Sequence, residues 1–114
     1  MSADWSARTP GCEGCGCGGH DLGEWNLTYN LSRMLGEAGF AGWSAVVGND
    51  IAATGRSVTA AMEPVLAELK RDPAKYKAMN PANGWGSYDQ AVRVISECLD
   101  VLRTNPDAVV SSWL

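Results

Sequence analysis

The turn that begins at Asn80 constrains the fold of this chain more than any other stretch of its sequence. Asn80 precedes a proline, which pushes it out of the α region, and Asn83-Gly84 is a dipeptide that tolerates the positive φ angles of a tight turn. Ser87 stands three residues before Gln90, the spacing of a capping box that satisfies free backbone N–H groups at a helix start. The sequence therefore predicts that one helix ends before this turn and another begins directly after it.

The helix after the turn is predicted to run from Tyr88 to Thr104. Its apolar residues recur at helical spacing and form one stripe: Tyr88, Ala91, Val92, Ile95, Cys98, Leu99 and Leu102. Arg103 lies in the last turn, where a cation complements the helix dipole. Asn105-Pro106 ends the helix, because proline cannot continue it.

Three shorter helices are predicted before the turn from their apolar spacing. They are expected at residues 31–38, 57–71 and 73–80. Gly39 suits the position after the first of these helices, and either Ser57 or Thr59 would cap the second. Pro64 fits poorly inside the second helix, since its ring removes a hydrogen bond. Asp72 followed by proline is a typical start for the third.

Two strands are predicted near the two ends of the folded part. Residues 24–29 alternate, with Trp25, Leu27 and Tyr29 on one side and polar residues on the other, which indicates a half-buried strand. Residues 108–114 indicate a second strand, and we expect the two strands to pair. The predicted fold is therefore mainly α with a small two-stranded β pair (α+β), three to four helices, and adjacent N- and C-terminal strands.

The composition of the chain changes at about residue 24. Residues 1–23 hold three of the four cysteines and the only histidine, and the glycine-rich run 14–19 has little propensity for helix or strand. We expect residues 1–23 to be a flexible tail, unless a metal or a partner orders it. Residues 24–114 are expected to form a single globular domain.

The charge and hydropathy of the chain limit the classes of partner that we expect it to bind. A net charge of −4 at pH 7, without a basic run, makes nucleic acid an unexpected partner. No apolar run approaches the roughly 20 residues that a membrane helix needs. The N-terminus also lacks the regions of a signal peptide. The sequence therefore favours a cytoplasmic protein without a membrane partner and leaves its oligomeric state open.

The first candidate site is the run Cys12, Cys15, Cys17 and His20. Thiolate and imidazole are the preferred ligands of zinc, and four of them make a tetrahedral site. Structural zinc sites usually take ligand pairs from two separated segments, however, whereas these four lie within nine residues. Two interpretations stay open: a compact zinc site, or a Gly/Cys-rich tail whose thiols bind nothing.

The second candidate site is the turn around Trp85. Glycines flank Trp85 on both sides, so its indole is expected to be accessible and able to stack on a ligand or partner. The residues expected to bind are Asn83, Trp85, Tyr88 and Asp89, with Thr28 and Asn30 as neighbours. The start of a helix at this place favours an anion. The alternative is a purely structural corner in which Trp85 folds onto the core.

Catalysis finds little support in this sequence. The only histidine is His20, which lies in the expected tail, so no Ser-His or Cys-His pair can be placed inside the domain. No glycine-rich phosphate loop follows a predicted strand. We therefore expect a protein that is not an enzyme.

Three segments of the chain form a recognisable combination. They are Leu27-Thr28-Tyr29-Asn30 with Met34, Arg71-Asp72-Pro73-Ala74-Lys75-Tyr76 running into Asn80-Pro81-Ala82-Asn83-Gly84-Trp85-Gly86-Ser87-Tyr88, and Asn105-Pro106-Asp107-Ala108. This combination resembles small uncharacterised proteins encoded by bacteriophages of actinobacteria, over about residues 25–110. The resemblance implies a setting in the host cytoplasm but no mechanism, and the cysteine-rich segment lies outside it.

The leading functional expectation is a non-enzymatic phage accessory protein that binds a host macromolecule, such as a host protein. Five tryptophans in so small a domain cannot all be hidden easily, which favours an aromatic contact surface. One alternative is a protein that binds a small, nucleotide-like ligand with the Trp85 turn. Another is a structural component of the phage.

Overall fold

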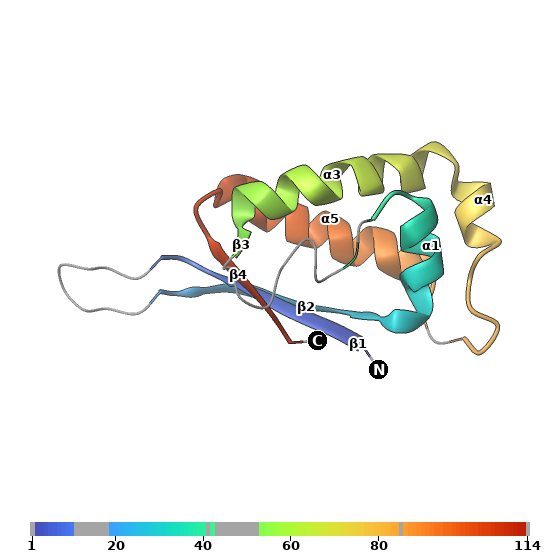
Figure 1. Ribbon diagram of the computed structural model, residues 1–114, viewed down its shortest axis with the longest axis horizontal. Coiled ribbons are helices and arrows are strands. Elements are labelled where there is room, and N and C mark those ends of the chain that lie inside the picture. Colours follow the sequence, from blue (N-terminus) through green and yellow to red (C-terminus); the bar gives the residue numbers. More distant parts are fainter. Residues whose placement is uncertain (1, 11–18, 41, 43–52, 85, 114) are drawn as a thin grey trace.

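The computed structural model describes residues 2–10, 19–40, 42, 53–84 and 86–113. These residues form a two-layer α+β structure, in which an antiparallel sheet is covered on one face by helices α3 and α5 (Figure 1). The strands are β1 (Ser2–Arg8), β2 (Asp21–Thr28), β3 (Ala53–Thr54) and β4 (Val109–Trp113). The helices are η1 (Tyr29–Leu31), α1 (Ser32–Glu37), α3 (Gly55–Arg71), α4 (Pro73–Lys77) and α5 (Tyr88–Thr104). None of the helices in the described part of the chain is long and apolar enough to cross a membrane.

The sheet corrects the predicted two-stranded pair. Its four strands lie in the order β2-β1-β4-β3, so β1 separates β2 from β4, the two strands that were expected to pair. Residues 2–8 were assigned to a flexible tail, yet they pair with β2 on one side and with β4 on the other. The reason is the alternation of this segment, which turns Trp5 and Ala7 into the core.

The inner face of the sheet is anchored by Trp5, whose side chain is 1% exposed. Its ring centroid lies 6.3 Å from that of Trp25 on the neighbouring strand. Its indole N–H donates to the Cys98 Sγ of α5 at 3.4 Å. Burial of the Cys98 thiol raises its pKa to about 11. The first strand and the long helix are therefore parts of one core.

The helices confirm most of the local predictions. The α5 helix has the predicted bounds, and the Ser87 hydroxyl accepts the Gln90 N–H at 3.1 Å. Asp72 caps α4, which ends at Lys77 rather than Asn80. Gly39, two residues after the last residue of α1, has a φ of 98°, as expected for the position that follows a helix. The Phe40 N–H donates to the Leu35 carbonyl oxygen, as in a Schellman motif.

The start of α3 differs from the prediction. Thr54, not Ser57 or Thr59, is its N-cap, and Ser57 completes a capping box from the third helical position. The helix begins earlier because Thr54 and Ser57 satisfy its first free backbone groups. Its first residue, Gly55, packs closely against the end of α5, where an added Cβ would lie 2.4 Å from the Asn105 carbonyl oxygen. The apolar stripe of α3 is buried, and Pro64 lies inside this helix.

Candidate functional site

The turn before α5 approaches the end of β2 at Gly86. A Cβ added to Gly86, which has a φ of 100°, would lie 2.6 Å from the Thr28 Cγ2. Only glycine fits such a close approach at positive φ. Beside it, the Asn30 side-chain amide donates to the Thr28 hydroxyl at 2.9 Å. Thr28 and Asn30 are therefore neighbours of the turn.

Tyr88 does not belong to an exposed contact surface, which corrects its assignment as a binding residue. Its side chain is 7% exposed, and its hydroxyl donates to the Leu69 carbonyl oxygen of α3 at 2.8 Å. Its backbone N–H donates to the Asn80 side chain at 2.8 Å. Burial raises the pKa of its phenol. Tyr88 lies on the apolar stripe of α5, and this position rather than the nearby glycines decides its environment.

The other predicted residues of the turn are only partly placed. Asn83 and Asp89 are exposed, and Trp85 lies outside the described residues. A hollow of about 290 Å³ is lined by Ser87, Asp89, Gln90 and Arg93 at the start of α5. The Asp89 carboxylate opposes the helix dipole's attraction for a phosphate at this place. The Arg93 guanidinium in the same lining has the opposite charge, so the charges of the lining give no preference for an anionic ligand.

The predicted metal ligands stand between β1 and β2 in the sequence. Thr9 and His20 pair, since the Thr9 N–H donates to the His20 carbonyl oxygen at 2.9 Å and the His20 N–H donates to the Thr9 hydroxyl at 2.7 Å. His20 itself is exposed. The cysteines Cys12, Cys15 and Cys17 lie outside the described residues. In the described part of the chain, no three potential ligands lie together.

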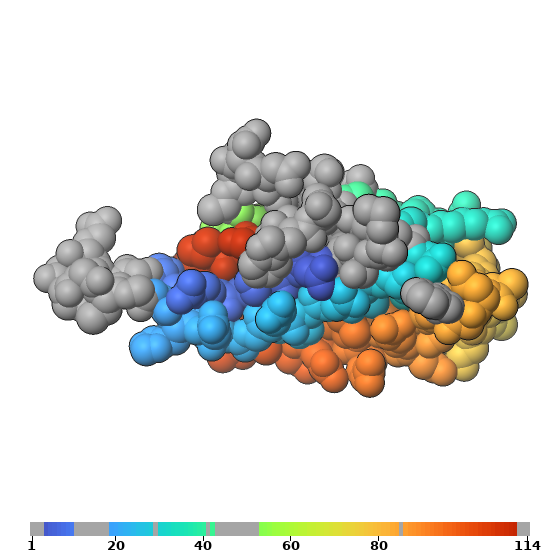
Figure 2. Space-filling model, turned by 90° about the horizontal axis from the view of Figure 1, so that it is seen from below, coloured from blue at the N-terminus to red at the C-terminus, as the bar shows by residue number. Residues whose placement is uncertain are grey.

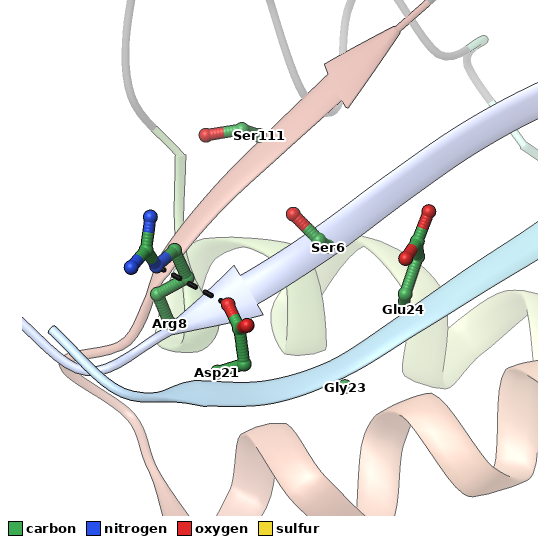
Figure 3. A pocket seen from close by; sticks show the side chains of 6 residues that line it. All are labelled: Ser6, Arg8, Asp21, Gly23, Glu24 and Ser111. Atoms are coloured by element: carbon green, nitrogen blue, oxygen red, sulfur yellow. Dashed lines mark ion pairs between the residues drawn. The ribbon is translucent and has the colours of Figure 1, made fainter.

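A third site, which the sequence analysis did not find, lies on the face of the sheet opposite α3 and α5. It is a hollow of about 460 Å³. Figure 3 shows the side chains that line it, which come from three strands. Its lining residues are Ser6 and Arg8 of β1, Asp21, Gly23 and Glu24 of β2, and Ser111 of β4. Figure 2 shows this outer face, with β1 and β2 running across it and α5 bordering β2.

A β-bulge in β2 determines which residues of β1 and β2 lie opposite each other at the hollow. Ala7 lies opposite Gly23 and Arg8 opposite Asp21, so β2 carries one additional residue, Leu22, between these two pairs. Leu22 packs against the core. The bulge therefore keeps a leucine inward and brings the Asp21 carboxylate beside the Arg8 guanidinium on the outer face.

The charged side chains that line the hollow interact only weakly with one another. The Arg8 Nε lies 3.3 Å from the Asp21 Oδ1, and these side chains are 57% and 84% exposed. Ion pairs so exposed to water contribute about 1 kcal/mol or less to stability. Glu24 is exposed and forms no ion pair with a described residue. These groups remain available to exchange partners.

The only sequence signal for the hollow was the alternation of β1. Asp4, Ser6 and Arg8 point outward while Trp5 and Ala7 point inward, a strand pattern with one polar face. Recognising it would have required β1 to be separated from the glycine-rich segment that follows. Comparison with known proteins adds nothing here, because no family model, no curated protein and no solved structure matches the chain.

Proposed function

We propose that this protein is a non-enzymatic binding module that docks a macromolecular partner on the outer face of its sheet. The observation that supports this proposal is the hollow across β1, β2 and β4, on the face opposite α3 and α5. Backbone pairing fixes the spacing of its side chains on three strands. A partner would therefore meet a preformed surface.

A macromolecule suits this surface better than a small ligand does. Small-molecule sites are mostly apolar and bury most of the ligand surface. Apart from Gly23, every residue that lines this hollow has a polar or charged side chain, and the Asp21 side chain is 84% exposed. A small molecule would stay largely in water there, whereas a protein segment could reach the hollow with one side chain and cover the surrounding strands.

The charges favour a partner that presents a basic side chain. Glu24 lacks an ion-pair partner among the described residues, and Asp21 shares its charge only with the exposed Arg8. An incoming lysine or arginine side chain would neutralise Glu24 without displacing a buried contact. The resemblance to phage proteins suggests that the partner is a macromolecule of the bacterial host, so we place the protein in the host cytoplasm as an accessory factor.

The experiment compares the parent with variants of the outer face. A tagged protein is used to capture a partner from lysate of an actinobacterial host, and the purified partner is then titrated against each variant. Glu24→Arg and Ser111→Arg should abolish binding, because each places a cation in the hollow. Glu97→Arg on the exposed side of α5 is the matched charge control and should bind like the parent. Equal affinity of all three variants, or no partner at all, would contradict the proposal.

A small-ligand site at the Trp85 turn is the second candidate, and the hollow at Ser87, Asp89, Gln90 and Arg93 is the observation in its favour. Its volume of about 290 Å³ is near the lower end for ligand pockets. The charges of its lining give no preference for a nucleotide phosphate. The docking surface on the sheet therefore remains the preferred proposal.

We also propose that the segment between β1 and β2 binds zinc through Cys12, Cys15, Cys17 and His20. The Thr9–His20 pair supports this proposal, because it closes the chain at the base of the segment that carries the cysteines. The Arg8 guanidinium adds to the closure by donating to the Gly19 carbonyl oxygen at 3.0 Å. Zinc would be structural there, since all four protein ligands would be supplied by one loop.

A further inference from the structure

The lysines of this chain are confined to one corner of the molecule. All three, Lys70, Lys75 and Lys77, lie within eight residues of the sequence. Lys70 is in the last turn of α3, and the other two are in α4, at the opposite end of the molecule from the C-terminal end of β1 (Figure 1). All three side chains are exposed. We call them the lysine corner.

The acidic groups next to the lysine corner are already engaged. Glu68 receives two hydrogen bonds from Arg71 and a third from the Tyr76 hydroxyl at 2.9 Å. The Asp72 carboxylate accepts the backbone N–H of Lys75 as the N-cap of α4. No lysine forms an ion pair with a described residue. The neighbouring carboxylates therefore do not neutralise the ammonium groups of the lysine corner.

Two of these ammonium groups form cation–π contacts with the rings of buried tyrosines. The Lys75 Nζ lies 5.1 Å from the centroid of the Tyr76 ring, and the Lys77 Nζ lies 5.5 Å from that of Tyr88. Cation–π contacts of this kind contribute little but restrict where the charge resides. The tyrosines themselves are 0% and 7% exposed. The rings thus hold the lysines in place without offering a stacking surface of their own.

The arginines behave in the opposite way. Four of the six form ion pairs with described carboxylates: Arg8, Arg56, Arg71 and Arg103. In a chain of net charge −4, the cations are therefore either paired or gathered at the lysine corner, apart from Arg33 and Arg93. An electrostatic field of this form attracts an anionic partner to one end of the molecule.

We propose that the lysine corner binds an acidic segment of a partner protein. Duplex nucleic acid is disfavoured, because a stiff duplex would extend past the corner over a surface with an excess of carboxylates. Single-stranded nucleic acid gains most of its non-electrostatic affinity from stacking on exposed aromatic rings, and the tyrosines here are buried. A flexible acidic peptide can instead fold around three closely spaced ammonium groups. This surface is separate from the docking face of the sheet, so either proposal can fail alone.

The test measures binding of a fluorescein-labelled oligoglutamate peptide by fluorescence anisotropy at low and at physiological salt. The parent protein should bind, and the affinity should fall as salt is added. The triple variant Lys70→Gln, Lys75→Gln, Lys77→Gln should bind about tenfold more weakly, the loss expected for three exposed ion pairs. Circular dichroism should show that this variant stays folded.

The matched control removes three positive charges elsewhere, in Arg56→Gln, Arg93→Gln, Arg103→Gln. It should keep most of the affinity of the parent, because these side chains lie outside the corner. An equal loss in both triple variants would mean that net charge alone attracts the peptide and would overturn the proposal. Absence of peptide binding would also overturn it, as would tighter binding of a labelled oligothymidine or of vesicles containing phosphatidylserine.

Discussion

Ser87 is the N-cap of α5. Its hydroxyl accepts the Gln90 N–H, one of the backbone groups that a helix start leaves without a partner. Ser87→Ala should lower the free energy of unfolding by about 1 kcal/mol, the usual loss for an N-cap. Urea denaturation followed by circular dichroism measures this difference directly.

Ser32 provides the control for this substitution. It is the first residue of α1, it is exposed, and the start of that helix shows no side-chain cap. Ser32→Ala should therefore change the free energy of unfolding by less than about 0.5 kcal/mol. Equal effects of the two alanine variants would show that the Ser87 hydrogen bond does not stabilise α5.

Glu68 makes the stability of the fold depend on pH in the acidic range. Hydrogen bonds from Arg71 and from Tyr76 lower its pKa from 4.5 to about 2. Because the pKa is lower in the folded than in the unfolded state, this stabilisation is complete above pH 4.5 and is lost as the pH falls towards 2. Glu68→Gln should therefore melt with a shallower pH dependence across that window. Parallel melting profiles for parent and variant would refute this assignment.

At the scale of elements, helices were easier to predict than strands. The stripe of α5, the Asp72 cap of α4 and the Gly39 ending of α1 are all local patterns, and local patterns suffice to form a helix. The β1 strand pairs both with β2, the next strand in the sequence, and with β4, which follows it by about a hundred residues. The glycine-rich segment between β1 and β2 resembles a tail and concealed the first pairing, and no short-range signal marks the second.

The difference between local and long-range patterns also explains which features of the candidate sites the sequence could indicate. Thr28 was expected beside the turn, but the close approach of Gly86 to it is a long-range contact that only the structure shows. Tyr88 was misassigned because its apolar-stripe position outweighs the glycines beside it. The hollow around Glu24 could not be predicted without β1, since one of its three walls is that strand.

The place of β1 in the core leads to a stability prediction. Trp5→Ala should destabilise the protein by about 3–5 kcal/mol, the range for a fully buried tryptophan. A flexible tail would instead tolerate this change. Asp4→Ala, on the outer face of the same strand, is the control and should cost far less. A Trp5→Ala variant that melts like the parent would remove β1 from the folded core.

At the scale of the whole molecule, the candidate surfaces lie on different parts of one two-layer body. The proposed docking face is the outer side of the sheet, and the lysine corner lies at α4 (Figure 1). The proposed zinc ligands Cys12, Cys15, Cys17 and His20 stand between β1 and β2 in the sequence. Residues of β1, α3 and α5 belong to the one core that these elements share. A substitution at one surface should therefore leave the other two intact, which makes the separate tests interpretable.

The segment between β1 and β2 supplies the last prediction, because its chemistry can be separated from the fold. We expect about one zinc ion per chain in freshly purified, untagged protein, measured by native mass spectrometry with elemental analysis. Cys15→Ser and Cys17→Ser should each release the metal while the circular dichroism of the core stays unchanged. The core should persist because the described strands pair without the cysteine segment.

Cys98 is the internal control for this experiment. It is buried between β1 and α5, where its Sγ accepts the Trp5 indole N–H and its raised pKa keeps it a neutral thiol. A neutral buried thiol is a poor zinc ligand, so Cys98→Ala should retain the metal even if it loses some stability. Protein without stoichiometric zinc, or equal loss of zinc from the Cys98 variant, would show that the cysteines between β1 and β2 do not form the site.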